Sequence, residues 1–146
     1  MAGLYLHVPF CKQACHYCNF HFSTSLKYRD EMLTAMIREL EFRKVYLGGK
    51  VLDSIYFGGG TPSILPLESL ESVLEAIHIH FSVAPDAEIT LEANPDDIHV
   101  PTLKAWKALG VNRLSIGIQS FWDDELSFMN RAHSGEEAIR AVDRAR

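Results

Sequence analysis

Hydrophobic and polar positions alternate along four short segments of the chain, and a stretch with helical periodicity follows each of them. We expect strands over residues 4–8, 54–57, 87–92 and 113–119. We expect helices over residues 26–46, from about residue 66, around Trp106, over 123–130 and from residue 134 onward. Strands and helices in strict alternation favour an α/β fold with a parallel sheet and right-handed crossovers.

Short polar residues and glycines mark the expected helix ends. The Ser23-Thr24-Ser25 cluster is suited to capping the first helix, and Gly48-Gly49 should stop it. Gly110 stands where a glycine ends the third helix, and Ser134 with Glu137 three residues later forms a capping box.

The alternation within the strands indicates that one face of the sheet is polar. In the fourth strand Arg113, Ser115, Gly117 and Gln119 alternate with Leu114, Ile116 and Ile118. A parallel sheet covered on both faces would have nearly continuous apolar strands. We therefore predict an incomplete TIM-type βα barrel of about four βα units, with a polar lumen and chemistry at the carboxyl ends of its strands, rather than a flat doubly wound sheet.

Composition limits the class of partner. A net charge of -5 among 146 residues, without a basic run, argues against nucleic acid. The first residues lack the features of a signal peptide, and no apolar run approaches the ~20 residues of a transmembrane segment. We expect a cytoplasmic protein. Because the last helical pattern is still running at Arg146, we expect residues 1–146 to be the N-terminal part of a longer domain.

The chain has three cysteines, and all of them lie within eight residues: Cys11, Cys15 and Cys18. In a reducing compartment such spacing favours metal binding over disulfides. Three thiolates can bind three irons of a cubane 4Fe-4S cluster and leave the fourth iron open. A zinc site completed by His7, His16 or His21 is an alternative, as are inert thiols.

Further candidate site residues follow the other strands. The Gly58-Gly59-Gly60 triplet lets backbone approach a ligand closely, although it could be a simple turn. Glu92 and Gln119 end the third and fourth strands on the polar face, where each could instead be a solvated strand-end residue. Their position at the same edge as the cysteines favours a shared ligand.

The cysteine motif C-x-x-x-C-x-Y-C resembles that of the radical S-adenosylmethionine (SAM) superfamily. The resemblance implies that the open iron chelates the methionine end of SAM, and that an electron from the cluster yields a 5'-deoxyadenosyl radical. The segment from Gly58 to Pro62 resembles the superfamily's glycine motif, which contacts the same end of SAM.

Motifs along nearly the whole chain resemble the oxygen-independent coproporphyrinogen III oxidase family, in the right order. They are Tyr5 to Cys11, the glycine triplet, Leu91-Glu92-Ala93-Asn94-Pro95, Gly117 to Phe121 and Asn130-Arg131. The resemblance implies SAM contacts at Tyr5, Tyr17, Gly59, Gly60, Thr61, Glu92, Gln119 and Arg131, with Tyr17 near the adenine. Tyr5 could instead be a packing residue, and Arg131 could belong to a surface ion pair.

Phe20 distinguishes two branches of that family. The decarboxylating oxidase carries a further cysteine there, whereas a phenylalanine resembles the heme chaperone (HemW) branch. That branch implies heme as cargo, a heme-acceptor protein and an electron donor for the cluster. The alternative is the oxidase itself.

Phe10 and Phe20 could shield the cluster or simply pack in the core, and the seven histidines are expected at the surface.

Overall fold

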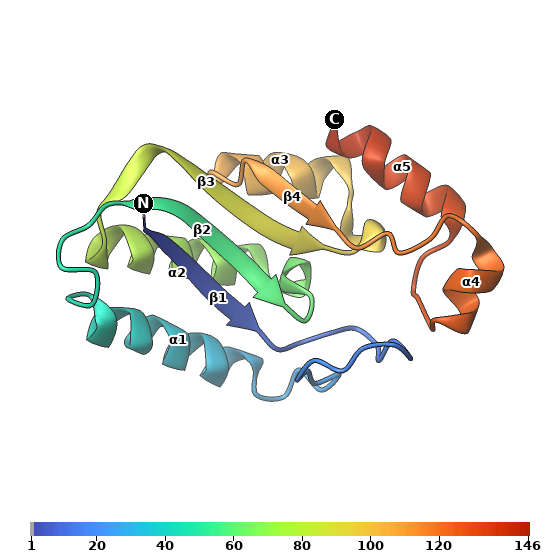
Figure 1. The fold of residues 1–146 in the computed structure, drawn as a ribbon, viewed down its shortest axis with the longest axis horizontal. Coiled ribbons are helices and arrows are strands. Elements are labelled where there is room, and N and C mark those ends of the chain that lie inside the picture. The colour runs from blue at the N-terminus through green and yellow to red at the C-terminus, as the bar shows by residue number, and fades with distance from the viewer. Residues whose placement is uncertain (1) are drawn as a thin grey trace.

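The computed structural model describes residues 2–146, and its centre is a four-stranded parallel sheet (Figure 1). The strands are β1 (Gly3–Val8), β2 (Leu52–Gly59), β3 (Val83–Ala93) and β4 (Arg113–Ile116), and they lie side by side in the order β1-β2-β3-β4. In a doubly wound sheet the strand order reverses partway along the chain, whereas in a barrel each new strand pairs with the strand before it. The predicted α/β fold with four barrel-type βα units is therefore confirmed.

Residues 2–146 contain five α-helices, and each comes after a strand along the chain. They are α1 (Arg29–Arg43), α2 (Leu67–His80), α3 (Val100–Ala108), α4 (Asp123–Phe128) and α5 (Gly135–Ala145). Two single 3-10 turns, η1 (Pro62–Ile64) and η2 (Pro95–Asp97), come directly after β2 and β3. In Figure 1, α4 and α5 lie beyond the arrowheads of the strands, on the side to which the chain runs after β1. None of the helices in residues 2–146 has the length and apolar character that crossing a membrane requires.

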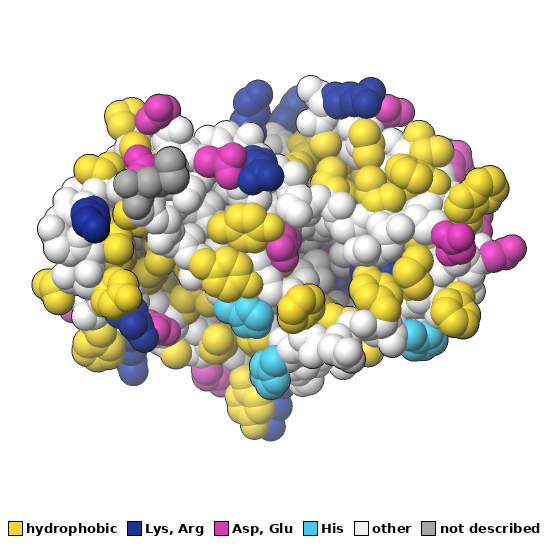
Figure 2. Space-filling view, in the orientation of Figure 1, with side chains coloured by type: hydrophobic (Ala, Val, Ile, Leu, Met, Phe, Trp, Pro, Cys, Tyr) yellow, Lys and Arg dark blue, Asp and Glu magenta, His cyan; other side chains and the backbone are white. Residues whose placement is uncertain are grey.

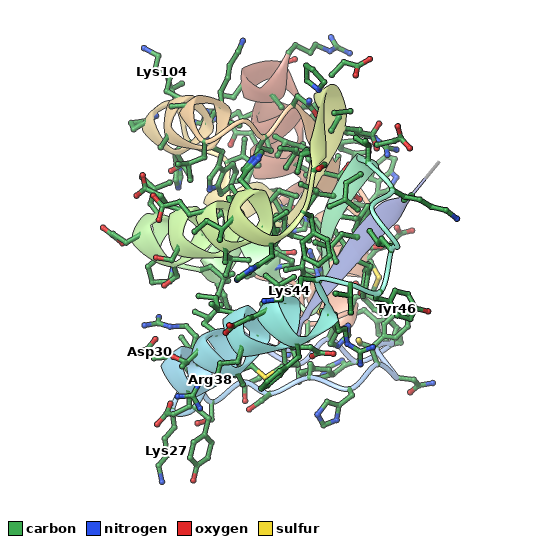
Figure 3. All side chains as sticks on the ribbon, turned by 90° about the vertical axis from the view of Figure 1, so that its left-hand side faces the viewer. Lys27, Asp30, Arg38, Lys44, Tyr46 and Lys104 are labelled. Atoms are coloured by element: carbon green, nitrogen blue, oxygen red, sulfur yellow. The ribbon has the colours of Figure 1, made fainter. Side chains whose placement is uncertain are left out.

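The apolar face of the sheet packs against α1, α2 and α3. Leu6, Phe57 and Leu91 stand level with one another on the first three strands, and each is at most 3% exposed. Leu40 of α1 and Trp106 of α3 belong to the same buried cluster. The opposite side of α1 is charged, because Asp30 and Arg38 point away from the sheet, as does Lys27 just before the helix (Figure 3). Burial of one face of the sheet therefore leaves its other face free for polar side chains.

The polar face largely matches the prediction. Tyr5 is level with Tyr56, and Glu92 is level with Ser115, so that polar side chains line up across neighbouring strands. Thr90 is an exception, since it is only 1% exposed. Tyr56 and Arg113 flank Thr90 in register and cover it from both sides.

Several predicted element boundaries are wrong. Strands β2 and β3 are longer at both ends than predicted, and α1 is shorter at both ends. Helix α1 begins at Arg29 rather than at residue 26, and Ser23 does not cap it because Ser23 is bridged to Phe10 beside the sheet. Strand β4 ends at Ile116 rather than at residue 119, and Gln119 lies in the following loop with φ 66°. The alternation of polar and apolar residues continues past the end of β4 because residues of a loop beside a cavity also point alternately into the cavity and away from it.

The predicted helix ends are confirmed in part, and so is the predicted exposure of the histidines. Gly110 has positive φ just after α3, and the capping box of Ser134 and Glu137 is formed. Gly48 and Gly49 also have positive φ, but they do not stop α1, which already ends at Arg43. The expectation that every histidine lies at the surface is wrong for His133, which is 4% exposed. Its Nε2 lies 3.0 Å from the carbonyl oxygen of Ile118, so the loop after β4 covers it.

Candidate functional site

The carboxyl ends of the strands form one edge of the sheet, and the cysteine loop leaves from that edge. Val8 is level with Gly59, and Ala93 is level with Ile116. A cavity of about 250 Å³ lies at this edge, and a recess opens near the middle of the corresponding face in Figure 2. Ten of the eleven predicted site residues line it: Cys11, Cys15, Tyr17, Cys18, Gly59, Gly60, Thr61, Glu92, Gln119 and Arg131.

The glycine segment holds the start of the cysteine loop against β2. The Gly60 amide donates to the Val8 carbonyl at 2.8 Å, and the Thr61 amide donates to the Phe10 carbonyl at 2.7 Å. A Cβ on Gly60 would lie 2.6 Å from the Phe10 oxygen and 2.9 Å from the sulfur of Cys11. Only glycine lets the loop approach so closely, which explains the glycine better than a simple turn does.

Burial raises the pKa of the Cys11 thiol. The hydroxyl of Thr61 lowers that pKa by hydrogen bonding, while the neighbouring Cys18 and Cys15 raise it because they carry like charge when ionised. Cys15 and Cys18 are therefore close enough to the Cys11 thiol to affect its ionisation. A bound cation or metal cluster would relieve this repulsion.

Within residues 2–146, no group of three His, Cys, Asp or Glu side chains is arranged to hold a single metal ion. The zinc alternative needs such a group, and His16 uses its Nδ1 atom in a contact with the Phe128 carbonyl at 2.8 Å. A cubane cluster has a different requirement, because each thiolate binds a different iron. Three cysteines around a cavity meet that requirement without converging on one point.

Glu92 supplies a carboxylate to the cavity from the end of β3. It accepts hydrogen bonds from the Tyr56 hydroxyl at 2.7 Å and from the Gly59 amide at 3.1 Å. The bond to Glu92 is the main reason that the pKa of Tyr56 is raised, since the phenol loses this bond when it ionises. Glu92 is thus held in place by β2 rather than left as a solvated strand end.

Arg131 reaches across the cavity from the loop before α5. Its Nη1 atom donates to the sulfur of Cys15 at 3.3 Å and to the hydroxyl of Tyr17 at 3.4 Å. Its Nη2 atom donates to Asn94 Oδ1 at 2.8 Å and to the Gly117 carbonyl at 2.7 Å. None of these four partners is a carboxylate, so the surface ion-pair interpretation of Arg131 does not hold.

Tyr5 is the one predicted site residue that does not line the cavity. Its ring stacks on Tyr56 with 5.9 Å between centroids, and its hydroxyl lies 3.1 Å from His7 Nδ1. The packing interpretation of Tyr5 therefore fits the contacts observed. The two phenylalanines also differ: Phe10 is 5% exposed in the core, whereas Phe20 is 76% exposed and lines the cavity.

Sequence reasoning missed several residues of the site. Asn94, Ser115 and Gly117 also line the cavity, and the last two stood on the predicted polar face. Lys12 pairs with Asp97 and, at 2.7 Å, with Asp96, which ties the cysteine loop to η2. No sequence pattern indicated that pairing, because 84 residues separate Lys12 from Asp96.

Comparison with known proteins gives a consistent result. The model of the Radical SAM superfamily matches residues 5–146. A protein of Escherichia coli (strain K12) named heme chaperone HemW is 37% identical over 143 residues, which are 96% of this chain and 38% of that protein. The mitochondrial radical S-adenosyl methionine domain-containing protein 1 of Mus musculus is 39% identical over 151 residues, 99% of this chain and 33% of that protein.

A solved structure agrees with the fold. Coproporphyrinogen III oxidase (HemN) from Escherichia coli, described as a radical SAM enzyme, superposes with a TM-score of 0.90 and 29% sequence identity. The match covers 98% of this chain and 33% of that one. The chain thus spans about a third to two fifths of the length of the proteins it resembles.

Proposed function

Because the chain belongs to the radical SAM superfamily, we propose that it is part of a HemW-like heme chaperone that carries a 4Fe-4S cluster and binds SAM. Cys11, Cys15 and Cys18 would hold the cluster. The observation that supports this most directly is that all three cysteines share one cavity with Glu92 and Arg131. Thiolates suit iron, and a carboxylate and a guanidinium suit the charged end of an amino acid.

The cluster site is supported by the packing around it. Gly60 leaves the space beside the Cys11 sulfur that a side chain would fill, and Arg131 donates to the Cys15 sulfur. When bound, such a cluster can supply one electron to the sulfonium of SAM, which is the chemistry that gives the superfamily its name. The protein's own contribution is to hold three ligands and to leave one iron accessible.

The charges around the cavity suggest how SAM would be oriented. Glu92 offers a negative partner for the ammonium group of the methionine moiety. Arg131 offers a positive partner for its carboxylate, whereas Lys12 is already paired with two aspartates. Tyr17, Thr61 and Gln119 complete the proposed pocket, with Tyr17 next to the adenine. Tyr5 would act indirectly, through Tyr56 and its hydrogen bond to Glu92.

Two observations favour the chaperone over the oxidase. The relatives named heme chaperone are 36–38% identical to this chain, and the cavity holds Phe20 where the oxidase has a further cysteine. The high structural similarity to HemN keeps coproporphyrinogen III oxidase as the second candidate. In the chaperone, heme would be the cargo, and an acceptor protein and an electron donor would be the partners.

The full-length protein can separate the two candidates. After anaerobic reconstitution with iron and sulfide, we expect it to bind heme and to pass it to an apo-hemoprotein. We expect no conversion of coproporphyrinogen III when SAM and a reductant are present. Formation of protoporphyrinogen under these conditions would replace the chaperone by the oxidase. Purification with zinc but without iron or sulfide would contradict both candidates.

A further inference from the structure

Four backbone and side-chain contacts join the cysteine loop to the end of α4. The amide of His16 donates to the Met129 carbonyl at 3.1 Å, and His16 Nδ1 lies 2.8 Å from the Phe128 carbonyl. Gln13 Nε2 donates to the Asn130 carbonyl at 2.5 Å, and Asn130 Nδ2 donates to the Ala14 carbonyl at 2.7 Å. These contacts span residues 13–16, between the first and last cysteines, and none of them requires a bound cluster.

Asn130 has a backbone conformation that normally favours glycine. Its φ is 55°, and the amide of Arg131 donates to the Leu126 carbonyl at 2.9 Å, so Asn130 is the left-handed residue that ends α4. Glycine would adopt this conformation with less strain. Asparagine tolerates it and adds a side-chain donor, and that donor is used on the Ala14 carbonyl. The residue type thus suits a second role besides ending the helix.

The other flank of the loop is tied independently. Lys12 pairs with Asp96 and Asp97, and Asp97 also accepts a hydrogen bond from Ser63 at 2.5 Å. The loop is therefore anchored to η2 on one side and to the end of α4 on the other. Without the second anchor, the segment that carries Cys15 would be tied mainly through Arg131.

We infer that Asn130 is a positioning residue that holds the loop around Cys15 in its cluster-binding shape before any cluster is present. This inference rests on the proposed function, because it assigns the loop to cluster binding. Asn130 and Ala14 are exposed, so their hydrogen bond adds little to global stability. Its effect should instead be local: loss of one such bond should make local opening of the loop roughly five- to tenfold more frequent.

The test compares the full-length apoprotein with two variants, Asn130→Gly and Asn130→Asp. Glycine keeps the helix end but removes the donor, and aspartate keeps the shape but turns an acceptor toward the Ala14 carbonyl. We expect both variants to melt like the wild type. We expect amide hydrogen exchange in residues 14–18 to be about five- to tenfold faster, and iron uptake during reconstitution to be slower.

Asn19→Asp is the matched control, because it adds the same charge to an exposed position in the same loop. We expect this variant to exchange like the wild type. If the amides of residues 14–18 exchanged in Asn130→Gly at the wild-type rate, the inference would be overturned. Equal acceleration in the two aspartate variants, with wild-type behaviour of the glycine variant, would overturn it as well, since charge alone would then be responsible. If the wild type took up no iron, the proposed function would fail, while the exchange rates of the apoprotein would still decide the role of Asn130.

Discussion

Gly60→Ala perturbs the closest approach between the glycine segment and the cysteine loop. The new Cβ would lie 2.6 Å from the Phe10 carbonyl oxygen, 2.9 Å from the Phe10 amide nitrogen and 2.9 Å from the Cys11 sulfur. Two of these atoms belong to the backbone and cannot move by a side-chain rotation. Because real Cβ contacts are longer, the loop must shift away from β2. We expect a loss of about 1 to 3 kcal/mol in the free energy of unfolding, as for other overpacked sites.

Urea unfolding of the full-length apoprotein measures this loss, and iron and sulfide analysis after reconstitution measures its effect on the cluster. We expect a lower unfolding midpoint and substoichiometric iron. Gly3→Ala is the control, because its Cβ would meet mainly the side-chain oxygen of Ser54, at 2.8 Å, which can rotate away. Wild-type stability together with full iron content in Gly60→Ala would refute the steric argument.

Three further predictions concern single side chains. Cys15→Ser should abolish cluster assembly while far-UV circular dichroism stays that of the wild type, since the cysteine lies on a loop; an intact iron and sulfide content would contradict its role as a ligand. Glu92→Gln should weaken SAM binding by roughly ten- to a hundredfold, because the ammonium group would exchange an oppositely charged carboxylate for an uncharged amide; calorimetry showing unchanged affinity would remove Glu92 from the site. Burial lowers the pKa of His133 below its usual value of about 6.5. The unfolded chain therefore binds more protons than the folded protein, and the free energy of unfolding should fall as the pH drops below about 6.5. His133→Gln should show a smaller fall in urea titrations at several pH values, and an identical pH dependence would contradict this assignment.

The fold could be predicted from the sequence because local patterns determine it. Alternation in β1, β3 and β4 distinguished a polar from an apolar face, and that difference alone favoured a barrel wall over a doubly wound sheet. Thr90 and the residues after Ile116 departed from the pattern. In both places neighbouring residues, rather than the alternation itself, decide whether a side chain is covered.

The candidate site could be predicted in outline because parallel strands bring their carboxyl ends to one edge. This rule placed Glu92 and the glycine triplet beside the cysteine loop. The contacts of Lys12 with η2 and of Asn130 with Ala14 were not predictable in this way. They join segments 84 to 116 residues apart through side chains on loops, for which no periodicity exists.

The most direct test follows the individual irons of the cluster. Full-length protein reconstituted with iron-57 should give a Mössbauer spectrum in which roughly one quarter of the absorption changes when SAM is added, because three thiolates leave one of the four irons of a cubane cluster open. A spectrum in which SAM changes none of the irons, or protein that assembles no such cluster, would contradict the account.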